Sequence, residues 1–238
     1  MFAHRGLVAD RGTEPNTFAA FAAAQAAGVD YIESDCHLTS DGVVVLFHDD
    51  TLASITGDPR RVDEVTEREM EDQLAGVGGL VTLEQAFDAF PDTRFNIDVK
   101  AEAAAAPAGR IIGEYAERAL LTSFSDARRA EGLAAAGPSR PATSAGKETI
   151  IRLLGAVALR RATRAAEILR GIDALQIPER QGPVRVLSRR LIEYAHAAGT
   201  EVHVWTVNDT KRMRELVAMG VDGVVTDVAD AALEALGS

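Results

Sequence analysis

The sequence has almost no cysteine and no long apolar run. Cys36 is the only cysteine among 238 residues, which excludes an intramolecular disulfide and a cysteine-based metal cluster and is compatible with a reducing cytoplasm. No apolar run approaches the roughly 20 residues of a membrane-spanning helix, and no charged and apolar leader precedes the opening MFAHRG. We therefore expect a soluble, cytoplasmic protein without a stable membrane anchor.

Basic residues are also in deficit. The 25 lysines and arginines stand against 36 aspartates and glutamates, so the formal net charge is −11. A protein of this charge repels polyanions, which argues against nucleic acid or an anionic membrane as its main partner. A small anionic substrate would need a local cluster of positive charge.

Strand-like runs rich in Val, Ile and Phe alternate with alanine-rich helical stretches along the whole chain. The hydrophobic content of 47% suits one domain with a large core, residues 1–238. This alternation predicts parallel βαβ units and, with about eight repeats, a (β/α)8 TIM barrel. The expected strands are residues 1–4, 31–38, 94–100, 120–124, 140–143, 174–177, 201–207 and 223–226.

One segment, residues 49–81, interrupts the alternation. It is polar and too long for an ordinary barrel loop. We expect a short insertion after the second strand region, too small for a core of its own, that forms a flap beside the mouth of the barrel. Elsewhere the helix starts are clear, with Asn16-Thr17 before FAAFAAAQAA and Asp209-Thr210 before KRMRELVAM as expected caps.

Carboxylates recur two residues apart at the expected strand ends. Glu33 and Asp35 point to the same face of their strand, and by the same parity Asn96, Asp98 and Lys100 share a face of the next core strand. An oxygen-rich group of this kind suits Mg²⁺ or Ca²⁺. Strand-end carboxylates are more often solvated or paired with an arginine, so the spacing alone leaves both interpretations open.

Two histidines, His4 and His48, also lie at expected strand ends. Imidazole transfers protons near neutral pH, although a lone histidine is more often structural. Arg5 and Lys100 are suited to hold a phosphate, and their alternative is ion pairing with neighbouring carboxylates. The remaining histidines are interpreted as packing or surface residues: His37, His196 and His203.

Taken in order, these pieces resemble the glycerophosphodiester phosphodiesterase family. The matching pieces are HRG (residues 4–6), ExD (33–35), FHD (47–49), NxDxK (96–100) and a tail that reads VHVWTVND through GVDGVVTD (202–227). With TLE (82–84) and TSF (122–124) between them, the resemblance runs nearly from residue 1 to residue 228. Single pieces are weak signals, whereas their order over the whole chain is specific.

The resemblance implies a reaction and a role for each residue. The expected reaction is metal-dependent hydrolysis of a small glycerophosphodiester to glycerol 3-phosphate and an alcohol. The implied roles are proton transfer by His4 and His48, one divalent ion (Mg²⁺ or Ca²⁺) on Glu33, Asp35 and Asp98, contacts with phosphate or substrate from Arg5, Lys100 and Trp205, and support from Glu14, Asn96 and Asn208. Asp227 is expected to shape a loop and not to take part in the chemistry.

Two departures from the family pattern keep alternatives open. Most relatives have glutamate where Asp98 stands, and Glu14-Pro15 reverses their Pro-Glu order, so Glu14 would have to supply that carboxylate from one residue earlier. The alternatives are a related enzyme that acts on lysophospholipids, like a lysophospholipase D or sphingomyelinase D, and a catalytically weak phosphate-binding barrel.

Overall fold

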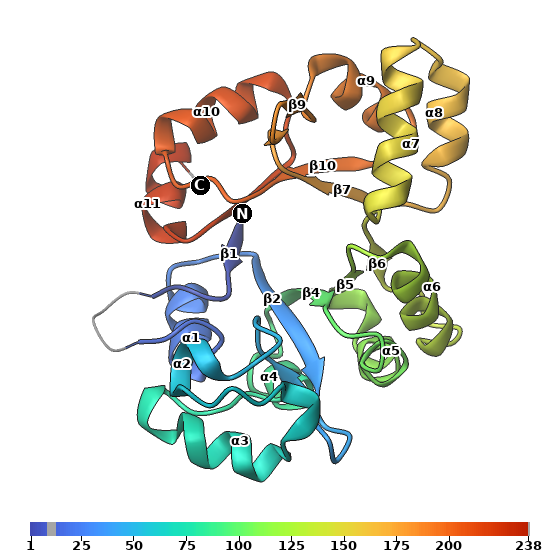
Figure 1. The fold of residues 1–238 in the computed structure, drawn as a ribbon. Coiled ribbons are helices and arrows are strands. Elements are labelled where there is room, and N and C mark those ends of the chain that lie inside the picture. Colours follow the sequence, from blue (N-terminus) through green and yellow to red (C-terminus); the bar gives the residue numbers. More distant parts are fainter. Residues whose placement is uncertain (9–12, 238) are drawn as a thin grey trace.

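Eight short parallel strands form a barrel in the computed structural model, which describes residues 1–8 and 13–237 (Figure 1). Their order is β6-β5-β4-β2-β1-β11-β10-β7, and a parallel bridge between Ser144 and Ala174 brings β6 and β7 together. The strands are β1 (Phe2–His4), β2 (Tyr31–Leu38), β4 (Arg94–Val99), β5 (Ala119–Thr122), β6 (Ala142–Thr143), β7 (Ala174–Ile177), β10 (Glu201–Val204) and β11 (Gly223–Thr226).

All eight expected strands are present, and the (β/α)8 prediction is confirmed. Three of them end earlier than expected, at Val99, Thr122 and Val204. After these residues the hydrogen bonding to the neighbouring strands stops. The residues that follow, Lys100, Ser123 and Trp205, line the cavity at the mouth of the barrel. Two further pairings were not expected: β3 (Val44–Leu46) runs antiparallel to β2, and β8 (Arg180–Gln181) forms a hairpin with β9 (Val184–Arg185).

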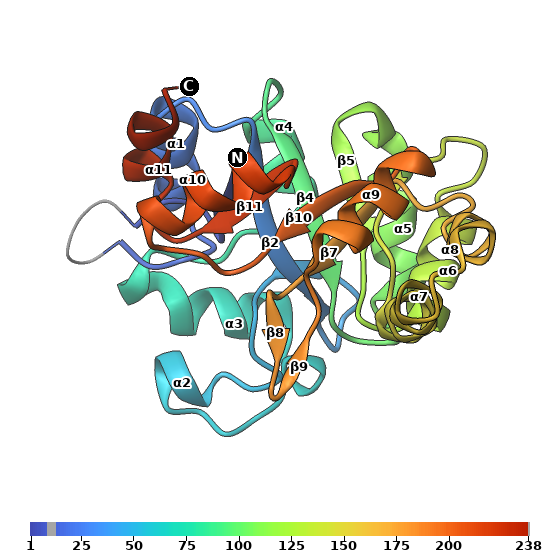
Figure 2. The same cartoon turned by 90° about the horizontal axis from the view of Figure 1, so that it is seen from above.

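Helices surround the strands on the outside of the barrel, as the two views show (Figures 1 and 2). The expected caps are present: the Thr17 hydroxyl accepts from Ala20 N, and the Asp209 carboxylate accepts from Lys211 N and Arg212 N. Within the described residues, no helix has both the length and the apolar character needed to cross a membrane. The α-helices of the barrel are α1 (Phe18–Ala26), α4 (Leu83–Ala89), α5 (Ala105–Glu114), α6 (Asp126–Ala135), α7 (Lys147–Ala158), α8 (Ala162–Ile168), α9 (Arg189–Ala197), α10 (Thr210–Met219) and α11 (Ala229–Leu236), and a short 3-10 helix covers Ala116–Arg118.

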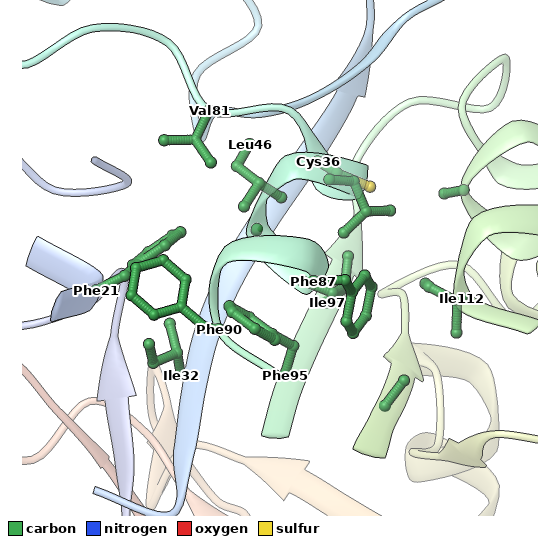
Figure 3. Packing of buried hydrophobic residues seen from close by; sticks show 14 of the residues in the cluster. Phe21, Ile32, Cys36, Leu46, Val81, Phe87, Phe90, Phe95, Ile97 and Ile112 are labelled. Carbon is green, nitrogen blue, oxygen red and sulfur yellow. The ribbon is translucent and has the colours of Figure 1, made fainter. Parts of the chain in front are cut away.

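Alternation along β2 and β4 separates an apolar layer from a polar one. Ile32 and Cys36 of β2 and Phe95 of β4 pack against helix residues such as Phe21 and Phe87 (Figure 3). The intervening residues of both strands therefore face the inside of the barrel. Burial raises the pKa of the Cys36 thiol, as suits the inert packing residue expected from the sequence.

The insertion of residues 49–81 folds into short helices. They are α2 (Ala53–Thr56), α3 (Glu67–Leu74) and two 3-10 turns, Val62–Glu64 and Ala75–Val77. A small cluster of buried side chains holds them, and this cluster is shared with β3: Val45, Phe47, Leu52, Val62, Val65, Met70, Leu74 and Leu80. Because β3 pairs with β2, the segment is attached to the barrel wall next to the polar strand ends.

One carboxylate joins two outer helices and predicts how stability depends on pH. Asp126 accepts from Thr149 N at 2.9 Å, Thr149 Oγ1 at 2.8 Å and Gly146 N at 3.2 Å, which ties the start of α6 to the start of α7. Burial raises the pKa of Asp126, but the hydrogen bonds from Thr149 outweigh it, so this pKa lies below its ordinary value. Because the pKa of Asp126 is lower in the folded than in the unfolded protein, the ionised carboxylate stabilises the fold at every pH above the unfolded-state pKa. This contribution is lost as the pH falls through the folded-state pKa.

We expect Asp126→Asn to lower the free energy of unfolding by about 1–2 kcal/mol at pH 7. The difference from the wild type should shrink below about pH 4, where the wild-type carboxyl also becomes protonated. Urea unfolding of both proteins at neutral and acidic pH measures this. An equal difference at both pH values would show that the charge is not the source of the stability.

Candidate active site

The carboxyl ends of the barrel strands open into a cavity of about 600 Å³. Glu14 does not line it but lines a neighbouring cavity of about 200 Å³, which shares Arg5 and His48 with the first. Asn208 does not line the larger cavity either. The candidate residues that the structure brings together in the larger cavity are His4, Arg5, Glu33, Asp35, His48, Asn96, Asp98, Lys100 and Trp205.

Strand register explains why these side chains meet. Glu33 on β2 is the partner of both His4 on β1 and Asn96 on β4, and two residues further along Asp35 is the partner of Asp98. Residues at the same level of adjacent parallel strands point the same way. The strand ends therefore form one polar floor to the cavity.

The two cations of this floor pair with its carboxylates. Lys100 Nζ lies 2.8 Å from Asp35 Oδ1 and 2.6 Å from Asp98 Oδ2, and Arg5 Nε lies 3.2 Å from Asp35 Oδ2. Burial lowers the pKa of Lys100, but Asp98 and Asp35 outweigh it, so its pKa lies above the ordinary value. The amine is therefore held charged at the centre of the site.

Several oxygens of the floor remain unsatisfied. Four buried oxygens have no hydrogen-bond partner among the residues that the structure describes: Glu33 Oε2, Asp35 Oδ2, Asn96 Oδ1 and Asp98 Oδ1. Arg5 Nε is within ion-pair distance of Asp35 Oδ2 but is not aligned for a hydrogen bond. Burial and the neighbouring Asp35 raise the pKa of Glu33, and burial raises that of Asp98. Buried oxygens without partners are costly, and a hard divalent cation satisfies such a donor set.

The carboxylates are not already arranged around a metal position. In the residues that the structure describes, no three His, Cys, Asp or Glu side chains form a metal-holding group. Arg5 pairs with Asp35, and Lys100 pairs with both Asp35 and Asp98. The types of donor thus fit Mg²⁺ or Ca²⁺, whereas their present arrangement is that of ion pairs.

His4 is held by residues from the far end of the chain. Its Nδ1 lies 2.6 Å from Asp227 Oδ1, across 223 positions of sequence, and its Nε2 lies 3.8 Å from Glu33 Oε2. Asn208 Nδ2 donates to Asp227 Oδ2 at 2.7 Å, and Asp227 N donates to Asn208 Oδ1 at 2.9 Å. The contact of Asp227 with His4 was not predicted from the sequence, although closure of the barrel makes β11 the neighbour of β1 and was the available signal.

His48 is held in a similar way from the insertion. Its Nδ1 lies 2.6 Å from Asp49 Oδ1, and the Ser54 hydroxyl of α2 donates to Asp49 Oδ2. Hydrogen bonds from Ser54 and His48 lower the pKa of Asp49 below its ordinary value. Both histidines therefore have Nδ1 engaged by a carboxylate, which leaves Nε2 for other partners.

A tight turn directs Arg5 into the cavity. Arg5 has a φ of 59° and Gly6 a φ of 89°, both in the left-handed region. A Cβ on Gly6 would lie 2.8 Å from the backbone of Ala20 on α1, so only glycine fits here. Arg5 N donates to Glu33 O at 2.7 Å, which fixes the turn on β2.

One side of the cavity is apolar. Trp205 and Phe124 meet edge to face with ring centroids 5.8 Å apart, and α7 and β9 extend this wall with Ile151 and Val184. Phe124, Ile151 and Val184 are 55%, 57% and 53% exposed. Of this wall only Trp205 was predicted as a substrate contact. Phe124 belongs to the TSF piece but was given no role, and Ile151 and Val184 lie on α7 and β9, outside the motifs.

Comparisons with known proteins show the family of the chain. The family model described as "Glycerophosphoryl diester phosphodiesterase family" matches residues 4–231. A "Probable glycerophosphodiester phosphodiesterase 2" of Mycobacterium tuberculosis is 38% identical over 231 residues, which cover 96% of this chain and 87% of that protein. A human "Lysophospholipase D" is 33% identical over 99 residues, 36% of this chain and 32% of that protein.

Solved structures share the fold. The chain is similar to an Oleispira antarctica phosphodiesterase whose structure holds the product sn-glycerol-3-phosphate, with a TM-score of 0.76 and 22% identity over 100% of this chain and 96% of that one. A glycerophosphodiester phosphodiesterase from Thermotoga maritima gives a TM-score of 0.76 at 23% identity and covers 98% of this chain and 96% of that one. At these identities the likeness shows the barrel alone.

Proposed function

The chain belongs to the glycerophosphoryl diester phosphodiesterase family, and from this premise we propose that it hydrolyses glycerophosphodiesters to glycerol 3-phosphate and an alcohol. The observation that carries the proposal is the floor of the cavity, where two imidazoles, two cations and buried oxygens converge. The chemistry of a phosphodiester calls for these groups, since proton transfer, charge balance and orientation of the phosphate must occur together.

The two histidines carry the proton transfers. One imidazole Nε2 takes a proton from the attacking oxygen, and the other donates a proton to the leaving alcohol, so that no strong base has to leave. Their Nδ1 atoms are engaged by Asp227 and Asp49, which supports this use of Nε2. Arg5 and Lys100 stabilise the charge that develops on the phosphoryl oxygens.

Glu33, Asp35 and Asp98 would hold one divalent ion, Mg²⁺ or Ca²⁺, which when bound supplies polarisation of a phosphoryl oxygen. Support comes from the buried oxygens of these residues that have no partner. Lys100 pairs with Asp35 and Asp98, and Arg5 pairs with Asp35. The cations are thus poised to exchange a carboxylate partner for a phosphate.

Release of glycerol 3-phosphate tests this function. The purified protein is incubated with a panel of glycerophosphodiesters, first with a chelator and then with Mg²⁺, Ca²⁺ or Mn²⁺ restored. We expect release of glycerol 3-phosphate that a chelator abolishes and one of these ions restores. Failure to cleave any member of the panel under all these conditions would favour the phosphate-binding barrel without catalysis.

The apolar wall favours a second candidate substrate, a lysophospholipid. Large apolar side chains that stay exposed together at the rim of a cavity commonly mark a binding surface. A single acyl chain on the glycerol would cover Phe124, Ile151 and Val184. The local likeness to a human lysophospholipase D agrees with such a substrate.

We expect Ile151→Asp to raise KM about fivefold for a short-chain monoacyl glycerophosphocholine, because apolar burial against the chain is lost. KM for glycerophosphocholine, which has no acyl chain, should stay unchanged. Both are measured by choline release below the critical micelle concentration. The matched control is Leu159→Asp, which changes a similarly exposed residue (63%) directly after the C-terminal end of α7 and outside the cavity. Equal effects of the two variants, or of Ile151→Asp on both substrates, would reject the acyl-binding wall.

A further inference from the structure

The insertion reaches the reaction centre through one carboxylate. Asp49, its first residue, lies 2.6 Å from His48 Nδ1 through Oδ1, while Oδ2 accepts a hydrogen bond from the Ser54 hydroxyl. Ser54 lies on α2, inside the insertion. A continuous chain of side-chain hydrogen bonds therefore runs from α2 to the imidazole.

Packing does not hold this imidazole. The side chains of His48 and Asp49 are 41% and 40% exposed, whereas that of His4 is 20% exposed. An exposed imidazole has rotamer freedom, and its two nitrogens compete for the proton. A carboxylate at Nδ1 selects the tautomer with Nδ1 protonated and leaves the lone pair on Nε2. The orientation of His48 thus depends on how firmly Asp49 is held.

Contacts within the insertion hold Asp49 in place through Ser54. Leu52, which immediately precedes α2, is fully buried in the cluster that the insertion shares with β3. The Thr56 hydroxyl at the end of α2 donates to Gln73 Oε1 on α3 at 2.9 Å. These contacts attach α2 to the rest of the insertion, so the Ser54 hydroxyl is presented from a supported helix.

We propose that Asp49 and Ser54 are positioning residues for His48, and that the insertion thereby belongs to the catalytic assembly. The inference rests on the proposed function, in which His48 transfers a proton. His4 has an equivalent arrangement in Asp227 and Asn208, supplied by the barrel itself. The His4 imidazole is therefore oriented by Asp227, which follows the last barrel strand, and the His48 imidazole is oriented by the insertion.

The kinetic test removes the Ser54 hydroxyl. We expect Ser54→Ala to lower kcat for a glycerophosphodiester about tenfold with KM within twofold, and Ser54→Thr, which keeps a hydroxyl, to recover most of the rate. Asp49→Asn should lower kcat further, by about 10². The matched control is Ser40→Ala, which removes an exposed hydroxyl between β2 and β3 that lies outside both cavities.

A second readout does not depend on activity. The ¹⁵N signals of the His48 ring, recorded where it is neutral, should show one Nδ1-protonated tautomer in the wild type and a mixture in Ser54→Ala, with the His4 signals unchanged. A normal kcat and an unchanged tautomer in Ser54→Ala would overturn the proposal, as would an equal loss of kcat in Ser40→Ala. If the wild type cleaves no phosphodiester while the tautomer still responds to Ser54→Ala, the proposed function fails and the positioning stands.

Discussion

Replacement of His4 or His48 by alanine is expected to lower kcat on glycerophosphodiesters by at least about 10², the usual contribution of a positioned proton-transfer group. Both imidazoles line the larger cavity with Nδ1 held by a carboxylate. Their side chains are 20% and 41% exposed, so little core packing is lost and the variants should fold. Steady-state kinetics and thermal unfolding of each variant measure the two effects.

The leaving group of the substrate separates the two histidines. A nitrophenol leaves without protonation, so the variant that lacks the general acid should recover most of its rate on a nitrophenyl phosphodiester, whereas the variant that lacks the base should not. His196→Ala is the control, because His196 pairs with Asp222 at 2.8 Å outside the cavity. Wild-type turnover by a folded His4 or His48 variant would remove that residue from the mechanism.

Asp98→Asn is expected to weaken metal binding and activity together, by about 10² at limiting metal, with partial recovery in excess metal. Asp98 Oδ1 is buried and has no hydrogen-bond partner within residues 1–8 and 13–237, and on the proposed function the substitution would remove one charged oxygen ligand. Titration calorimetry with Mg²⁺ and Ca²⁺ measures the affinity alongside the rate. A control is Asp88→Asn, which changes a carboxylate that accepts from the Tyr115 hydroxyl outside the cavity.

Asp98 also pairs with Lys100, and the same experiment distinguishes the two roles. Asp98 Oδ2 lies 2.6 Å from Lys100 Nζ. Loss of activity with unchanged metal affinity would show that Asp98 acts by holding Lys100 and does not bind the ion. Lys100→Met should then reproduce the kinetic defect of Asp98→Asn.

The barrel was predictable because its signals are local. A strand or helix is encoded by the period of its apolar residues, and eight such pairs suffice to predict the (β/α)8 fold. The same locality made the faces of the strands predictable: Glu33 and Asp35 meet Asn96 and Asp98 in register. The resemblance to the phosphodiesterase family, drawn from residues at these strand ends, is confirmed by the family model.

Strand ends and the structure of the insertion were less predictable. The apolar pattern does not show at which residue the hydrogen bonding between strands stops. The predicted strands therefore extended past their actual ends at Val99, Thr122 and Val204. The insertion has a polar sequence, yet it buries a few widely spaced side chains, such as Val62 and Met70, against β3. Such burial depends on contacts with a strand that precedes it in the chain.

Which side chains touch one another in the site depends on the closed barrel. Asp227 reaches His4 only because the last strand pairs with the first. Ile151 and Val184 line the same cavity as Trp205 only because α7 and β9 both border its opening. The types of the site residues and the strand face on which each one lies can be predicted from a short stretch of sequence, because both depend only on neighbouring residues. The carboxylate that holds His4 and the apolar wall depend on ring closure and side-chain orientation, which bring together residues that no local pattern connects. The carboxylate that holds His48 is instead its neighbour in the sequence, Asp49.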